Sequence, residues 1–376
     1  MTPYIDLAYG GPSVAVRSMA KSMLERGMEV HVAVTNAGGH ADKLWPDGMM
    51  RNEEGLFLHY FQRKIPRGWF RAPGMNHWLR ANVSAFDVLH LHVPFTAPFH
   101  AAALAARTYG RPYVASLHGV LDQWSLRQKT WKKTPYLHLF ERKNLLGASS
   151  LHVTAPIEKA CVENLNFGST IWCLPLPVPL LTKSLGYFQN TDVKHILCIA
   201  RLHPVKALPV LFKALARLRQ QGLPVVLDLA GDGEASYVRK LRQHIAKLGL
   251  GSSVIWHGQV NEAKKRELYA KASCFALLSH HENFGLAAAE AMAAGIPVVV
   301  SDQVGLAPDV LRFEAGIVVP SGNDEAAAIG LQMILEPTVG LAAGGRARQL
   351  VEQCYGATAF SDALCAMYKS ALKMGL

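Results

Sequence analysis

The chain has 376 residues, half of them hydrophobic, which is enough to bury the cores of two domains of ordinary size. Its 39 Lys and Arg against 28 Asp and Glu suit an anionic partner, such as nucleic acid, a phosphorylated small molecule or an acidic membrane surface. Neither a signal peptide nor an apolar run of about 20 residues is evident, so we expect no spanning helix. Six cysteines without a C-x-x-C pair indicate reduced thiols and a cytoplasmic location.

The first half of the chain alternates short apolar runs with segments of helical period. Such alternation is typical of a mostly parallel sheet covered by helices. Strands are predicted to start at Val30, Leu56, Val88, Tyr113, Leu151 and Ile171. Helices are predicted between most of them, including residues 12–26, 98–107 and 156–165.

Two short motifs in this half could meet a ligand. Gly10 and Gly11 precede Pro12, which suits the first position of a helix, and glycine allows a ligand to approach the backbone closely. His118 ends the strand that starts at Tyr113, where it either faces a ligand or only caps the strand. Each motif alone is a weak indication.

A Pro-rich segment, "LPLPVPLL" from Leu174, interrupts the pattern, which then restarts. Further strands are predicted to start at Ile196, Val225, Val254, Cys274, Pro297 and Gly316. The pattern predicts two Rossmann-like domains and a last helix over residues 358–372. Ligands of such sheets bind beyond the carboxyl ends of the strands, so a cleft between the domains is the expected site.

Arg201 and Lys206 follow the first strand of the second domain, where a helix begins. Arg offers a fork of donors and Lys a point charge, so this corner suits a diphosphate. Ordinary surface charge is an equally good explanation of the pair by itself.

The stretch "HENFGLAAAE" places Glu282 and Glu290 eight residues apart around a helix start at Gly285. Free amides and the helix dipole make such an N-terminus an anion site, so both carboxylates can border one bound molecule. Either carboxylate alone could be a solvated charge. The small apolar neighbours of Glu290 argue against this for that residue, because they indicate a packed helix.

Several common motifs are absent from the sequence. There is no D-x-D pair for a nucleotide-bound metal, no P-loop, no G-x-S-x-G and no G-x-G-x-x-G after the first strand. His90 and His92 share one face of their strand, but no third ligand supports a metal site. These absences weigh against a P-loop kinase, a serine hydrolase and a nicotinamide dehydrogenase.

The motifs together resemble the retaining glycosyltransferases of family 4. The stretch "ENFGLAAAEAMAAGIPVVVSD" is similar to that family's E-x7-E signature, and "ARLHPVKAL" to its G-R-L-x-x-x-K-G segment. The resemblance implies an α/β GT-B fold, with two Rossmann-like domains facing a central cleft. Residues 1–178 would bind the acceptor, residues 179–357 the nucleotide sugar, and the helix in residues 358–376 would cross back to the first domain.

The resemblance also implies roles for individual residues. Arg201 and Lys206 would neutralise the donor diphosphate without a metal or other cofactor, and Glu290 would accept hydrogen bonds from the ribose. Glu282 would meet hydroxyls of the transferred sugar, and His118 would lie near the reacting centre. The backbone of the remaining donor-binding residues would approach the sugar and phosphates: Gly11, Asn283, Phe284, Gly285 and Leu286.

The partners implied are a UDP- or GDP-sugar donor and a glycan or lipid-linked acceptor, in surface polysaccharide biosynthesis, with no role for nucleic acid. The stretch "WSLRQKTWKK" from Trp124 combines two Trp with four cations and could touch an anionic membrane. A solvated basic helix explains the same stretch slightly better.

The sequence also departs from the family pattern. Asn283 and Ala207 stand where glycines are usual. Only nine residues precede Gly10, so the usual first strand of the N-terminal sheet is expected to be missing, leaving a gap or an exposed edge. We interpret Met1 as an internal or misassigned start, or the chain as a degraded copy. Activity unchanged by an upstream extension would contradict this interpretation.

Two other classes of function fit the sequence. One is a sugar-nucleotide epimerase or hydrolase of related fold, which would turn over donor without an acceptor. The other is a catalytically impaired nucleotide-sugar binder, which would bind the donor without turnover.

Overall fold

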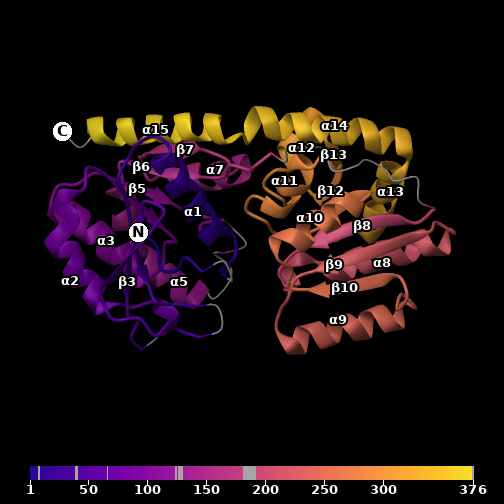
Figure 1. Ribbon diagram of the computed structural model, residues 1–376, viewed down its shortest axis with the longest axis horizontal. Helices are drawn as coiled ribbons and strands as arrows, with labels where there is room; N and C mark the ends of the chain where they lie inside the picture. Colours follow the sequence, from indigo (N-terminus) through magenta and orange to yellow (C-terminus); the bar gives the residue numbers. More distant parts are fainter. Residues whose placement is uncertain are drawn as a thin grey trace. The chain divides into compact units, whose positions relative to one another are not determined.

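The computed structural model describes residues 1–6, 9–38, 41–65, 67–122, 125, 130–180 and 192–374 (Figure 1). Half of the basic stretch from Trp124, including Arg127 and Lys129, lies outside the described residues. The chain divides into two compact units. Unit 1 comprises Met1–Pro177 and Ala357–Leu376, and unit 2 comprises Val178–Gly356, so both expected boundaries lie one residue later than the observed ones.

Unit 1 is built from short strands followed by helices, as the apolar runs predict. Its strands are β1 (Val30–Thr35), β2 (Met49–Glu53), β3 (Leu56–Phe61), β4 (Leu89–His92), β5 (Tyr113–Ser116), β6 (Ser150–Val153) and β7 (Thr170–Cys173). Its α-helices are α1 (Gly11–Leu24), α2 (Pro73–Asn82), α3 (Ala97–Thr108), α5 (Thr130–Tyr136), α6 (Arg142–Leu146), α7 (Pro156–Glu163) and α15 (Ala357–Met374). Short turns are η2 (Arg67–Trp69), η3 (Val83–Ala85) and the π-helical η4 (Leu137–Glu141).

The strands of unit 1 form two neighbouring sheets, ordered β1-β3-β2 and β4-β5-β6-β7. All pairs are parallel except β2 with β3. Met1 and Thr2 connect the two sheets: Thr2 pairs with Val34 of β1, and His92 of β4 donates its amide to the Met1 carbonyl at 3.0 Å. No strand lies between β1 and β4 in the described part of the chain, so the sheets are separate where the first strand is expected. Val34 of β1 and Leu91 of β4 are nevertheless buried.

Unit 2 contains one six-stranded parallel sheet, ordered β10-β9-β8-β11-β12-β13. These strands are β8 (Lys194–Ile199), β9 (Val225–Ala230), β10 (Val254–Gly258), β11 (Cys274–Leu277), β12 (Val298–Ser301) and β13 (Gly316–Val319). The helices are α8 (Leu208–Gln220), α9 (Ala235–Lys247), α10 (Glu262–Lys271), α11 (Leu286–Ala293), α12 (Ala307–Phe313), α13 (Asp324–Leu335) and α14 (Pro337–Cys354), preceded by η5 (Pro204–Lys206). The strand order changes direction between β8 and β11, which makes their carboxyl ends a topological switch point.

The last helix, α15, belongs to unit 1, where it packs against α1 and β5 (Figure 1). Its apolar face is fully buried at Leu364, Met367 and Ala371. Tyr368 on the same helix lies 2.7 Å from Nδ1 of His90 in β4. The helix is therefore an integral part of the first unit.

Among the described residues, no single helix is both long and apolar enough to cross a membrane. One bent pair, residues 324–335 with 337–373, satisfies a test of length and composition alone.

Candidate active site

The loops after β8 and β11 meet at the switch point of the unit 2 sheet. Between the two loops, His280 donates its amide to the Val205 carbonyl at 2.8 Å. Because parallel strands end at the same edge, residues far apart in the sequence converge here. This edge brings together Arg201, Lys206 and Glu282.

The loop after β8 carries both predicted cations. It contains the 3-10 turn η5, in which the Val205 amide donates a hydrogen bond to the His203 ring. The turn is followed by Ala207, which has φ of 49°. The left-handed conformation of Ala207 explains why glycine would suit this position. The turn leaves Arg201 exposed and Lys206 half-buried, as a donor of hydrogen bonds to a bound anion needs to be.

Two glycines after β9, Gly231 and Gly233, support this loop, and sequence reasoning did not identify them. Leu202 donates its amide to the Asp232 carbonyl at 2.8 Å. A Cβ on Gly231 would lie 1.9 Å from the Ala200 carbonyl oxygen, and one on Gly233 would lie 2.1 Å from that of Leu202. The signal was the "AGDGE" sequence directly after a buried strand, where close backbone packing requires glycine.

Lys206 and Glu282 form an ion pair across the switch point, in which Nζ donates to Oε2. Their side chains are only 16% and 22% exposed. The loop that carries Glu282 is fixed by Val304 and its neighbours: the Glu282 amide donates to the Gln303 carbonyl at 3.0 Å, and Gly305 donates to the Glu282 carbonyl at 2.8 Å. The carboxylate is therefore held beside the cation before any ligand is present.

The helix start predicted at Gly285 is α11, which begins at Leu286. Gly285 has φ of 99°, and a Cβ there would lie 2.9 Å from the Val304 side chain, so both conformation and space require glycine. Phe284 is buried and packs edge-on against Tyr355 at 5.1 Å, while Asn283 is half-buried. The backbone at the helix start is thus fixed, and its N-cap residue, Gly285, has no side chain to cap it.

Glu290 lies on the second turn of α11, where it is 23% exposed. Its Oε2 accepts hydrogen bonds from Tyr269 at 2.9 Å and from Lys265 at 2.7 Å, both on α10. Lys265 neutralises the packed carboxylate and Tyr269 donates a hydrogen bond to it; neither was identified from the sequence. Both contacts involve Oε2, and among the described residues Oε1 has no hydrogen-bonding partner.

Gly11 and His118 lie in unit 1. Gly10 has φ of 79° and caps α1, and a Cβ on Gly10 or Gly11 would meet no described atom within 4 Å. His118 follows β5 in the left-handed region, with φ of 52°, a strained conformation for a side chain of this size. Its Nε2 lies 3.0 Å from Nδ1 of His92.

Burial lowers the pKa of His118 to about 3, with nearby His152 adding to the effect, so this imidazole is neutral at pH 7. The pKa values of His90 and His92 are also lowered well below their usual range, first by burial. Among the described residues, no group of three or more His, Cys, Asp or Glu side chains is arranged to hold a metal ion.

Comparison with known proteins gives the family. Residues 186–343 match the model described as glycosyl transferases group 1, and residues 10–170 match the glycosyl transferase 4-like domain. A D-inositol 3-phosphate glycosyltransferase of Xylanimonas cellulosilytica is 33% identical over 90% of this chain and 87% of its own length. The chain belongs to the group 1 glycosyltransferases.

Solved structures support the same fold for this glycosyltransferase. Sucrose-phosphate synthase from Thermosynechococcus elongatus superposes with a TM-score of 0.79 at 20% identity, covering 96% of this chain and 93% of that one. The Anabaena protein HepE in complex with UDP-glucose gives a TM-score of 0.73 at 19% identity, covering 96% of both chains. The predicted GT-B fold is confirmed, with two Rossmann-like units and a C-terminal helix that returns to the first.

Proposed function

We propose that this glycosyltransferase transfers a hexose-type sugar from a nucleoside diphosphate donor, with retention, to a hydroxyl of a glycan or lipid-linked acceptor. The observation that carries the proposal is the ion pair of Lys206 with Glu282 at the switch point of unit 2. It sets a cation for phosphate next to a carboxylate for sugar hydroxyls, at the edge where such sheets bind nucleotides. Unit 1 supplies the acceptor side in this proposal.

The donor diphosphate is neutralised by Arg201 and Lys206, without a metal. Arg201 is exposed at the end of β8, where its planar fork suits two phosphate oxygens, and Lys206 adds a point charge. The backbone at Phe284, Gly285 and Leu286 contributes amides and the dipole of α11. Gly11 of unit 1 has open space above its Cα, which suits the close approach of a phosphate.

Two carboxylates fix the sugar and the nucleoside. Glu282 accepts hydrogen bonds from hydroxyls of the transferred sugar, and Asn283 is the next residue in the same loop. Glu290 accepts hydrogen bonds from the ribose hydroxyls through Oε1, since Tyr269 and Lys265 already donate to Oε2. HepE of Anabaena has been solved with UDP-glucose, which supports UDP as the nucleotide to test first.

Catalysis relies on stabilising the leaving diphosphate. As the bond between sugar and phosphate loosens, negative charge builds on the phosphate beside Arg201 and Lys206, which are already in place. The acceptor attacks from the same face and its proton passes to the leaving phosphate, so no protein nucleophile is needed. In this mechanism neutral His118 donates a hydrogen bond to the substrate, or accepts one from it, without adding charge.

A thermal-shift screen of UDP- and GDP-sugars tests the donor class. A ligand that binds only the folded state stabilises it by about 2.7 kcal/mol at a hundred times its Kd, so one nucleotide sugar should raise Tm. Lys206→Ala should remove most of that rise. If no nucleotide sugar raises Tm, the donor assignment is wrong.

The same donor then separates the alternatives. Turnover that requires an added acceptor supports the transferase. Hydrolysis or epimerisation of the donor without an acceptor would favour an epimerase or hydrolase, and binding without turnover would favour an impaired binder.

A further inference from the structure

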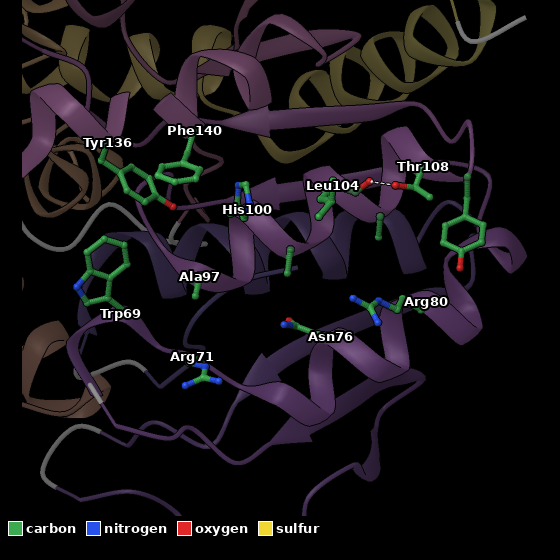
Figure 2. Close-up of a pocket in the computed structure, with 13 residues that line it drawn as sticks. Trp69, Arg71, Asn76, Arg80, Ala97, His100, Leu104, Thr108, Tyr136 and Phe140 are labelled. Atoms are coloured by element: carbon green, nitrogen blue, oxygen red, sulfur yellow. Dashed lines mark hydrogen bonds between the residues drawn. The ribbon is translucent and has the colours of Figure 1, made fainter. Parts of the chain in front are cut away.

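An elongated cavity lies in unit 1, and no residue of the candidate active site lines it. It has a volume of about 660 Å³, within the usual range for small-molecule sites. Figure 2 shows it along α3, with Trp69 and Tyr136 near one end and Thr108 near the other. Its lining comes from η2, α2, α3 and the segment formed by α5 and η4.

The floor of the cavity is one face of α3. Six lining residues recur at helical spacing along it: Ala97, His100, Ala101, Leu104, Ala105 and Thr108. The eleven-residue separation of the first and last corresponds to about 16 Å of helix. Three of the six are alanines four residues apart, so the floor is narrow and apolar, as a straight hydrocarbon chain requires.

Aromatic rings form the wall at one end. Trp69 packs edge-on against Tyr136 at 5.1 Å, Tyr136 lies 5.3 Å from Phe140, and Phe140 lies 5.6 Å from the His100 ring. Trp69, Phe140 and Leu104 are nevertheless 46%, 45% and 48% exposed. A contiguous exposed apolar surface of this kind is unusual on a soluble unit and marks an interaction site.

Two arginines lie along the rim on the α2 side of the cavity. In Figure 2 Arg71 lies toward the Trp69 end, Arg80 lies toward the Thr108 end, and Asn76 lies between them, one turn before Arg80 on α2. No Asp or Glu is among the lining residues, and within the described part of the chain neither arginine forms an ion pair. Burial lowers the pKa of His100, so this ring adds no charge at pH 7. The rim therefore presents two unpaired positive charges beside an apolar floor.

We propose that this groove binds a single-chain anionic amphiphile, with its hydrocarbon chain along α3 toward Trp69 and its phosphate at Arg80. An extended peptide would need partners for its main-chain groups, whereas this floor is mostly alanine and leucine. A neutral apolar molecule would leave Arg80 without a counter-charge. The proposal goes beyond the proposed function, because binding requires no transfer reaction.

Dodecyl phosphate below its micelle concentration is the probe, titrated into the full chain and followed by calorimetry. We expect saturable binding of one molecule per chain. Inorganic phosphate lacks the chain and dodecyl maltoside lacks the charge, so both should bind at least about ten-fold more weakly. Equal affinity for dodecyl maltoside would overturn the anionic assignment, and equal affinity for inorganic phosphate would overturn the role of the floor.

Matched variants locate the site. Leu104→Glu places a carboxylate on the floor and should weaken dodecyl phosphate binding at least about ten-fold, since the bound hydrocarbon chain would cover this charge and remove it from water. Leu146→Glu is the control, because Leu146 is also 48% exposed but lies on α6 outside the lining. Arg80→Ala should weaken binding about ten-fold through loss of a charged contact, whereas Arg239→Ala on exposed α9 should not.

Trp69→Ala provides a second variant, in the aromatic wall, in case Leu104→Glu does not fold. Circular dichroism confirms folding of each variant before titration. If Leu104→Glu or Trp69→Ala, once folded, binds dodecyl phosphate as the unaltered chain does, the amphiphile does not occupy this groove.

Discussion

The ion pair between Lys206 and Glu282 holds a single cation where the leaving diphosphate is proposed to lie. Lys206→Met should lower kcat/KM by about 10²–10³-fold, as removal of one preorganised group at developing charge does elsewhere. The control is Lys213→Met on α8. The Lys213 side chain is exposed, and its Nζ lies 3.9 Å from Oδ1 of Asp324. Steady-state kinetics with the donor found by thermal shift measures both. An equal loss in the two variants would contradict a role for Lys206 at the diphosphate.

Tyr269 is expected to position Glu290 for the ribose. Tyr269→Phe removes the 2.9 Å hydrogen bond to Oε2, and should cost about 1 kcal/mol of stability and raise the donor KM several-fold. Because the chemistry lies at the sugar, kcat should change little. A fall in kcat at constant KM would show that Glu290 does not act through the ribose.

The convergence of Arg201 with Lys206 was accessible from the sequence, because both lie in one loop after one strand. The contact of Lys206 with Glu282 was not, since it joins positions 76 residues apart. Lys265 and Tyr269 were also missed. Their helix α10 looks like a solvated charged helix in the sequence, and only its placement beside α11 gives those side chains a half-buried carboxylate to bind.

At the scale of elements, a directed chain of hydrogen bonds ties α15 to the unit 1 sheet. The Leu174 carbonyl can only accept, so Nε2 of His152 donates to it at 3.0 Å and Nδ1 accepts from Ser116 at 2.6 Å. The Ser116 oxygen then accepts from Nε2 of His90 at 2.7 Å, which leaves Nδ1 of His90 to accept from Tyr368. Every ring in this chain is neutral.

Tyr368→Phe should therefore destabilise unit 1. The substitution leaves Nδ1 of His90 buried without a donor, which costs about 1–3 kcal/mol. Tyr109→Phe is the control, because Tyr109 is 43% exposed. Urea unfolding followed by near-ultraviolet circular dichroism measures the difference. Equal stability of the two variants would mean that α15 is held by apolar contacts alone.

The buried histidines in this row of hydrogen bonds also predict that the stability of unit 1 depends on pH. Burial lowers the pKa of His152 to about 4, so between that value and its ordinary pKa of 6.5 the unfolded state binds more protons than the folded state. Its contribution to stability is complete above pH 6.5 and falls by up to about 1.4 kcal/mol per pH unit below it. Urea unfolding at pH 7.5 and 5.5 should show this loss. His152→Gln should reduce the slope but not abolish it, because burial also lowers the pKa values of His90, His92 and His118. An unchanged slope in the variant would assign the dependence to other groups.

Most elements could be predicted because buried parallel strands are short apolar runs between helical segments. Strand β2 was missed. It pairs with β3 at the edge of its sheet, and its sequence "MMRNE" is largely exposed, so it has no apolar run from which a strand could be predicted. The pairing of Met1 and Thr2 with β1 and β4 was missed for a related reason, because two residues are too few to show any periodicity.

At the scale of the whole molecule, each unit has its own hydrophobic core, and unit 1 is completed by a helix that comes last in the chain. A chain ending at Gly356 lacks α15, so the surfaces of α1 and β5 that it covers become exposed and Nδ1 of His90 loses Tyr368. Unit 1 should then unfold at lower urea, while unit 2 retains Arg201 and Lys206, the two cations of the proposed diphosphate site.

Limited proteolysis in increasing urea, with fragments assigned by mass spectrometry, follows the two units separately. Unit 1 of the shortened chain should be cleaved first, since loss of the buried side chains of Leu364 and Met367 alone is equivalent to several kcal/mol. Calorimetric titration with UDP should give the same affinity for both chains. A matching loss of UDP affinity on removal of α15 would mean that unit 2 depends on unit 1 for its binding site, and that the donor site is not a property of one unit.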